Sequence, residues 1–270
     1  NCGGTPPGPR MIGRWRDSPS PRGAEGTLRT QAMPARPRSR PARSKRRFRP
    51  LRTFVRLIVL FVGLSVLWVA IYRIVPPPFT FTMLGDVLAG RSVTKDWTAL
   101  SRIDADMARA VIAAEDSKFC SHWGFDAEAI AAAAARNAQG GRIRGGSTIS
   151  QQAAKNAFLW QGGGYFRKAL EAWFTVLIEA IWGKRRIMEV YLNIAETGIG
   201  TYGVEAGARR YFGHGAARLS PIEAARIAAV LPLPKRRPGA APTGFTRRYG
   251  NTIVRRMGVV RRDGLDACVR

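Results

Sequence analysis

Three stretches decide the fold expected of this chain: EDSKFCSHWG at Glu115–Gly124, GGSTISQQAAKN at Gly145–Asn156, and RKALE at Arg167–Glu171. They follow one another closely in the chain. Each is rich in polar and charged residues, which a packed core does not need. We therefore expect the three stretches to come together as one polar site.

Glu115 is the first candidate for a chemical role. A helix predicted from about Ala105 to Ser117 places its carboxylate in line with the apolar residues Val111 and Ile112. Burial there would raise the pKa of Glu115 and suit it to accept a proton as a general base. The alternative is a plain ion pair with Lys118 on an exposed face.

Asp116 and His122 belong to the same stretch, and we expect them to position Glu115 or to shape the loop that follows it. Gly124 is expected to allow a tight backbone turn there.

The second stretch predicts a helix start. Thr148 and Gln151 have the spacing of a capping box, with Ser147 alongside, and the first N–H groups of such a helix suit an anion. Lys155 follows at i+3 from Gln152, so amide and ammonium groups share a face. No complete GxxxxGK[ST] phosphate loop is present, and ATP is therefore not implied.

A later helix start is predicted by the same capping-box spacing. Ser220 and Glu223 are three residues apart, and Pro221 stands at the first helical position. The run LPLP at 231–234 is expected to end this helix.

The third stretch places Glu171 four residues after Arg167 and three after Lys168. One interpretation is an ordinary helical ion pair, which contributes about 0.3–0.5 kcal/mol. Two carboxylates in one site would also suit a hydrolase. The cluster of Lys155, Arg167 and Lys168 favours a diphosphate leaving group instead.

The N-terminal quarter of the chain predicts a membrane anchor. Residues 54–75 form an apolar run of 22 residues, which as a helix would span roughly 33 Å, enough for a hydrocarbon core of about 30 Å. Residues 1–53 are rich in Pro, Arg, Gly and Ser and predict a disordered basic tail that stays in the cytoplasm by the positive-inside rule. About half of the net charge of +26 lies in or beside this tail. Topology explains that charge, and nucleic acid is not an expected partner.

The remainder predicts a mainly α domain over residues 79–240, followed by a basic C-terminal extension over 241–270. The alanine-rich run at Asp126–Asn137 is interpreted as a packed core helix. The apolar segment Phe79–Gly90 suits either the bilayer surface or ordinary packing. Cys2, Cys120 and Cys268 are odd in number, so no disulfide framework is predicted, and a zinc site is improbable without paired Cys or His motifs.

On these motifs the chain resembles the monofunctional biosynthetic members of the family 51 peptidoglycan glycosyltransferases. KRRIMEVYLN at Lys184–Asn193 and GVEAGARRYF at Gly203–Phe212 match two further family motifs and look architectural, with Glu189 ranked well below Glu171 as the second acid. The resemblance covers about residues 80–240, and no penicillin-binding domain follows. It implies a lysozyme-like helical domain on a single transmembrane helix.

The resemblance also implies the reaction. Lipid II would be polymerised into β-1,4-linked glycan with inversion and release of undecaprenyl pyrophosphate, on the periplasmic side of the inner (cytoplasmic) membrane. The expected partners are lipid II, the nascent glycan chain, the lipid bilayer and other cell-wall synthesis proteins. The alternatives are a lytic lysozyme-type enzyme and a non-catalytic cell-wall scaffold.

By the same resemblance, Glu115 and Glu171 are the expected catalytic residues, and Glu171 also helps to place a divalent cation, Mg²⁺. The expected substrate-binding residues come from all three stretches: Asp116, His122, Ser147, Thr148, Gln151, Gln152, Lys155, Asn156, Arg167 and Lys168.

The chain departs from the family at one position. Many members carry an arginine eight residues after the motif lysine, where this chain has Gly163. We expect the phosphate contact to be missing or supplied by Arg142 or Arg144, and an arginine restored at Gly163 to raise donor affinity. Because all motifs lie beyond Phe79, the domain is also expected to fold without residues 1–75.

Overall fold

The computed structural model describes residues 50–138, 146–237 and 239–270 and is mainly α, as predicted. The predicted loop arginines Arg142 and Arg144, and nearly all of the basic tail, lie outside the described residues. The helices are α1 (Pro50–Ile74), α2 (Phe81–Leu88), α3 (Ala105–Glu115), α4 (Ala127–Ala138), α5 (Ile149–Phe158), α6 (Gly164–Ile181), α7 (Gly183–Ile194), α8 (Val204–Phe212), α9 (Pro221–Val230) and α10 (Gly244–Arg262). Short 3₁₀ turns lie at Leu100–Arg102, Ala216–Arg218 and Ala267–Val269.

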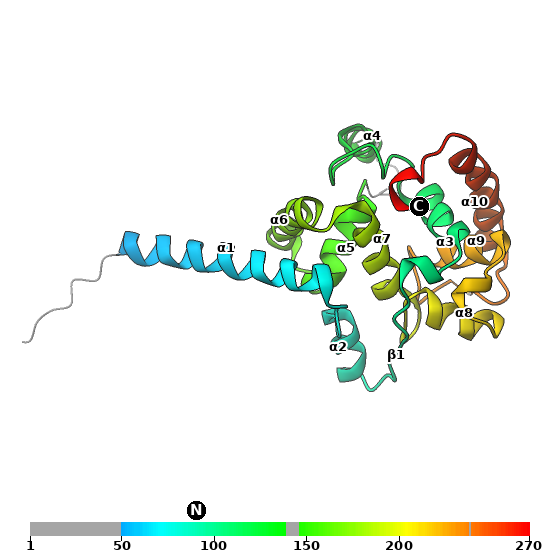
Figure 1. Ribbon diagram of the computed structural model, residues 1–270, viewed down its shortest axis with the longest axis horizontal. Coiled ribbons are helices and arrows are strands. Elements are labelled where there is room, and N and C mark those ends of the chain that lie inside the picture. Colours follow the sequence, from blue (N-terminus) through cyan, green and yellow to red (C-terminus); the bar gives the residue numbers. More distant parts are fainter. Residues whose placement is uncertain (1–49, 139–145, 238) are drawn as a thin grey trace, which may run out of the picture. The chain divides into compact units, whose positions relative to one another are not determined.

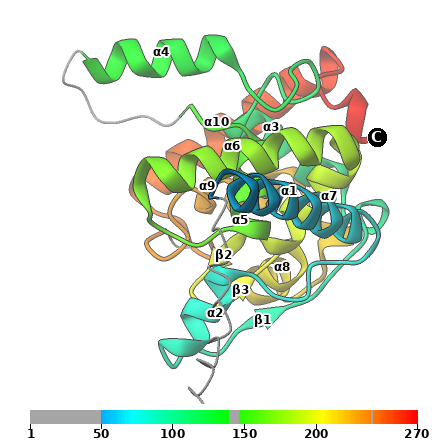
Figure 2. The ribbon, with the colours of Figure 1, turned by 90° about the vertical axis from the view of Figure 1, so that its left-hand side faces the viewer.

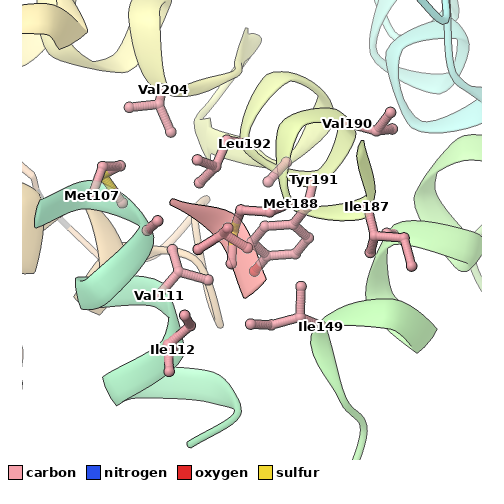
Figure 3. Close-up of a cluster of buried hydrophobic side chains, with 14 of the residues drawn as sticks. Met107, Val111, Ile112, Ile149, Ile187, Met188, Val190, Tyr191, Leu192 and Val204 are labelled. Carbon is pink, nitrogen blue, oxygen red and sulfur yellow. The ribbon is translucent and has the colours of Figure 1, made fainter. Parts of the chain in front are cut away.

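The helices of the domain pack in two groups, with α3, α9 and α10 in one and α5, α6 and α7 in the other. Figure 3 shows how the groups join: side chains of α3, α5 and α8 meet those of α7 around Tyr191 and Met188. Both residues are fully buried. This junction brings the end of α3 and the start of α5 face to face, which is where Glu115 and Thr148 lie.

A small sheet of three strands lies below α5, α6 and α7 in the view of Figure 2. Strand β3 (Thr201–Tyr202) is central, pairing in parallel with β1 (Thr94–Lys95) and antiparallel with β2 (Glu196–Gly198). The strands are too short to leave an alternating pattern in the sequence. The strands place two side chains of the candidate site next to each other, because Glu196 is paired with Tyr202 across the sheet.

Two predicted helix starts are confirmed as capping boxes. Thr148 Oγ1 accepts from the Gln151 N–H at 3.2 Å, and Gln151 Oε1 accepts from the Thr148 N–H at 3.0 Å. Ser220 and Glu223 make the same exchange at the start of α9, with Pro221 at the first helical position. The helix then ends at Val230, immediately before the proline-rich run that was predicted to stop it.

The core interpretation of the alanine-rich run is wrong. The run does form a helix, α4, but Ala133 is its only buried residue among the side chains described there. Figure 2 shows α4 standing apart from the helices beneath it. Alanine has the highest helix propensity and buries little surface, so this helix forms without a place in the core.

The C-terminal residues also differ from expectation. Helix α10 packs against α3 and α9, so residues 241–270 are part of the domain and not an appendage. Cys268 forms a disulfide with Cys120, with 5.5 Å between their Cα atoms. The odd number of cysteines gave no sign of this pair. Tertiary packing decides which two of the three cysteines approach each other. The bond ties the end of the chain to the loop after Glu115.

Helix α1 is the one described helix long and apolar enough to cross a membrane, with a mean hydropathy of 2.6 over its most apolar window. Its last turns nevertheless belong to the domain (Figure 1). Val69 is fully buried, and its carbonyl accepts from Trp182 Nε1 at 2.7 Å. Trp68 and Tyr72 lie against Phe158, at 5.3 and 5.6 Å between ring centroids. This packing argues against the expectation that the domain folds without residues 1–75, because its core would lose these side chains.

Two truncations test this packing. Removal of residues 1–60 should leave the free energy of unfolding in detergent nearly unchanged, because the deleted part of α1 is exposed on the surface of the protein. Removal of residues 1–75 should lower it by more than about 3 kcal/mol, the cost of deleting one large buried side chain. Equal stability of the two forms by chemical denaturation would contradict the embedding of Val69 and Trp68.

The disulfide gives a second prediction. Cys268→Ser should lower the free energy of unfolding by about 2–5 kcal/mol, as expected when a native bridge that closes a long loop is lost. The double variant Cys120→Ser/Cys268→Ser should cost no more than the single one, because the bond is already broken. Thermal unfolding measures both, with Cys2→Ser as the control. Additive losses would speak against the pairing.

Candidate active site

Glu115 is the last residue of α3, and one hydrogen bond from the described residues holds its carboxylate. Gln152 Nε2 of α5 donates to Glu115 Oε2 at 2.9 Å, and Tyr191 of α7 donates its hydroxyl to Gln152 Oε1 at 3.2 Å. Burial raises the pKa of Glu115, as the apolar stripe predicted. The alternative pairing is excluded in this structure, since Lys118 bonds to Glu128.

Asp116 connects the two halves of the site. Its carboxylate accepts from His122 Nε2 at 3.0 Å and from the backbone N–H of Ile149, the first residue of α5, also at 3.0 Å. Gly124 adopts a φ of +82°, and its carbonyl accepts from Thr148 Oγ1 at 2.6 Å. A Cβ at Gly124 would lie 2.8 Å from a methyl group of Thr175, so both conformation and space require glycine. The loop is thereby fastened to the start of α5.

The predicted binding residues of α5 divide into two sets. Thr148 and Gln151 are buried in the capping box, which places them in positioning roles away from any open surface. Gln152, Lys155 and Asn156 instead line a cavity of about 370 Å³. The second set lies where a substrate could reach it.

Lys155 is an unusual cation. Burial lowers the pKa of its ammonium group, with Arg167 and Lys168 adding to the effect. No carboxylate among the described residues forms an ion pair with Lys155, since Glu171 is taken by the other two cations. A half-buried, unpaired ammonium group in a cavity is suited to an anionic ligand.

Glu171 is buried and fully engaged. Arg167 Nη1 donates to one carboxylate oxygen at 2.7 Å, and Lys168 bonds to the other. Lys168 also reaches Ser147 Oγ at 3.2 Å, which joins the third stretch to the second. The ordinary helical ion pair considered from the sequence is therefore present, but in a buried form.

The residues present do not fit a metal ion bound by the protein. Both oxygens of Glu171 already accept from cationic groups, and a divalent cation beside Arg167 and Lys168 would be repelled. In the part of the chain that the structure describes, no three His, Cys, Asp or Glu side chains lie together as a donor set.

The backbone at Gly163 does not suit the arginine that many members of the resembled family carry at this position. Its φ is +88°, and an added Cβ would lie 3.0 Å from both Trp160 Nε1 and Arg167 Cβ. A side chain at this position is strained in conformation and in space. The expectation that Gly163→Arg raises donor affinity is therefore opposed by the backbone.

Sequence reasoning missed several residues around Glu115. The charge of Arg237 lowers the Glu115 pKa, opposing the effect of burial, and its guanidinium lies over the Phe245 and Tyr249 rings. Arg256 of α10 shares with Glu115 a second cavity of about 360 Å³. No local motif marks these residues, because they come from a part of the chain far from Glu115 in sequence.

The position of Glu189 agrees with its low ranking. Its oxygens accept from the Leu100 N–H at 2.9 Å and from Arg186. It holds a turn, and it does not line either cavity.

Comparison with known proteins bears on the same residues. The transglycosylase family model matches residues 82–258. The chain belongs to the transglycosylase family. The match includes Glu115, Lys155 and Glu171 and extends through most of α10, which agrees with the packing of that helix on α3.

Similar transglycosylases come from several bacteria. Biosynthetic peptidoglycan transglycosylases of Caulobacter vibrioides and Rhodospirillum centenum are each 50% identical over 79% of this chain, and the matches cover 93% and 94% of those proteins. One from Xanthomonas campestris pv. campestris is 48% identical over 78% of this chain and 87% of its own length.

The two glutamates should respond oppositely to neutralisation. Because folding raises the pKa of Glu115, the folded state loses stability as the pH rises from the ordinary glutamate pKa through the raised one, and the loss is complete above the raised pKa. Glu115→Gln should therefore unfold at the same or a higher temperature at pH 7, with the difference shrinking as the pH falls. Glu171→Gln should lose about 1.5–3 kcal/mol, because Arg167 and Lys168, which are only partly buried, lose the buried carboxylate that they share. Calorimetry measures both, and a destabilised Glu115→Gln would contradict the argument.

Proposed function

We propose that this protein is a peptidoglycan transglycosylase that polymerises lipid II into β-1,4-linked glycan strands. The observation that carries the proposal is the pairing of a desolvated carboxylate, Glu115, with an unpaired ammonium group, Lys155, through Gln152, which contacts the first and lines one cavity with the second. A base and an anion-binding group side by side suit the transfer of a sugar from a diphosphate.

In the proposed reaction, Glu115 acts as the base and the diphosphate is the leaving group. Glu115 removes the proton from the 4-hydroxyl of the acceptor sugar, whose oxygen attacks the anomeric carbon of the donor. The bond between that carbon and the phosphate oxygen breaks, and the electron pair leaves with undecaprenyl pyrophosphate. Attack opposite to the leaving group inverts the configuration. A raised pKa makes Glu115 a better proton acceptor than an exposed carboxylate.

The cations of the site act on the leaving group. Lys155 lines the cavity and forms no ion pair with a described carboxylate, so developing negative charge on the diphosphate is stabilised there. Arg167 and Lys168 hold Glu171 and keep the local charge positive. We propose that Mg²⁺ is brought to the site by the diphosphate of the substrate. The proton transfer to Glu115 and the departure of the diphosphate do not require it.

The membrane-facing parts support a lipid-linked substrate. Helix α2 buries Met83 and Asp86 but exposes Phe81, Leu84 and Leu88. Of the two roles considered for this segment, the bilayer surface is the better supported, since an apolar face at the foot of α1 is otherwise open to water. We propose that the basic N-terminal segment lies in the cytoplasm and the domain on the outer side.

Incubation of the protein with lipid II alone tests the proposal. The wild type should release free undecaprenyl pyrophosphate and form polymer, whereas Glu115→Gln should be inactive by at least about a hundredfold, since it lacks the base. Lys155→Ala should lower kcat/KM much more than the matched architectural variant Glu189→Gln. Cleavage of finished glycan without polymer formation would favour a lytic enzyme, and neither activity would favour a scaffold.

A further inference from the structure

Glu196 is a largely buried carboxylate that the proposed mechanism does not use. It is the first residue of β2, only 11% of its side chain is exposed, and it lines the 370 Å³ cavity together with Lys155. Its Oε1 accepts no hydrogen bond from any described residue. Because a buried carboxylate oxygen without a donor is costly, this atom calls for an explanation.

The neighbouring cation does not supply that donor. Lys235 Nζ lies 3.6 Å from Glu196 Oε1, which is too far for a hydrogen bond, and only 2.7 Å from Asp86 Oδ1. Asp86 also accepts from Arg91 and from the Tyr202 hydroxyl, so it is saturated and holds Lys235 in place. Lys235 thus balances the charge of Glu196 without occupying its oxygen.

The position of Glu196 relates it to the reacting groups. Gln152, Lys155 and Asn156 line the same cavity, and Gln152 is the residue that holds Glu115. A sugar bound beside Lys155 therefore has Glu196 within the same cavity.

The charges around the cavity select the kind of group that Glu196 can bind. Lys155, Lys235 and Arg236 line it and disfavour an ammonium group. A neutral O–H or N–H donor satisfies the carboxylate without that repulsion. Hydroxyl and acetamido groups of a sugar are such donors.

We infer that Glu196 is a specificity-determining residue that accepts a hydrogen bond from a hydroxyl or acetamido N–H of the lipid-linked sugar bound next to Lys155. The inference rests on the proposed function, because it names which part of the substrate this cavity recognises. Burial raises the pKa of Glu196 to about 6, so the side chain is mainly ionised at pH 7 and ready to accept.

Binding separates sugar recognition from damage to the cavity. In the Glu115→Gln background, which prevents turnover, the Kd of fluorescent lipid II is compared with and without Glu196→Gln. We expect lipid II binding to weaken by about tenfold, the value of one hydrogen bond to a charged group, while the Kd of undecaprenyl pyrophosphate, which has no sugar, stays unchanged. Asp263→Asn, which neutralises an exposed carboxylate, is the control.

Turnover and stability complete the test in the otherwise wild-type protein. Glu196→Gln should raise KM for lipid II more than it lowers kcat. Its melting temperature should not fall, because burial costs the charged form of Glu196 more than the ion pair with Lys235 returns. Glu196→Asp, which keeps the charge but withdraws it, should weaken lipid II binding as well.

Three outcomes would overturn the inference: unchanged lipid II binding, equal weakening of both ligands, or a loss of binding that follows a lowered melting temperature. Failure of the wild type itself to polymerise lipid II would instead overturn the proposed function.

Discussion

The carboxylate of Asp116 is the contact on which the arrangement of the site depends. It accepts from the first N–H of α5 and from His122 at once, and so fixes the loop after α3 to the start of another helix. An N–H at a helix start has no partner within its own helix, so the carboxylate satisfies it and gains from the helix dipole. Without this bond the Glu115 carboxylate would lose its defined position relative to Gln152 and Lys155.

The site contains two kinds of buried charge. Asp86 and Glu171 are surrounded by donors and stabilise the fold, and the pKa of Asp86 is lowered to about 2. Glu115, Lys155 and Glu196 have their pKa values shifted toward the neutral form by burial, and they all border the cavities. Poorly solvated charges weaken a folded protein, and they persist where a ligand or a reaction uses them.

Sequence spacing predicted those features that depend on one helix alone. The capping boxes at Thr148 and Ser220 and the desolvation of Glu115 follow from spacing along a single helix, and the structure agrees with them. The disulfide, the place of α10 in the core and the exposure of α4 depend on which surfaces meet, which spacing within one segment does not encode. Glu196 escaped notice for the same reason, since its lack of a donor is visible only once its neighbours are placed.

The packing of the last turns of α1 into the domain has a mechanical consequence. A flexible linker would let a catalytic domain move and tilt relative to a membrane. The packing of Val69 and its neighbours instead holds α1 rigidly against the domain, and this sets the distance between the apolar helix and the cavity that Lys155 lines. A substrate whose isoprenoid tail stays in the lipid then meets the cleft at a constant distance. Each sugar would then be added at the same distance from the lipid, and the finished part of the strand would move away from the site as it grows.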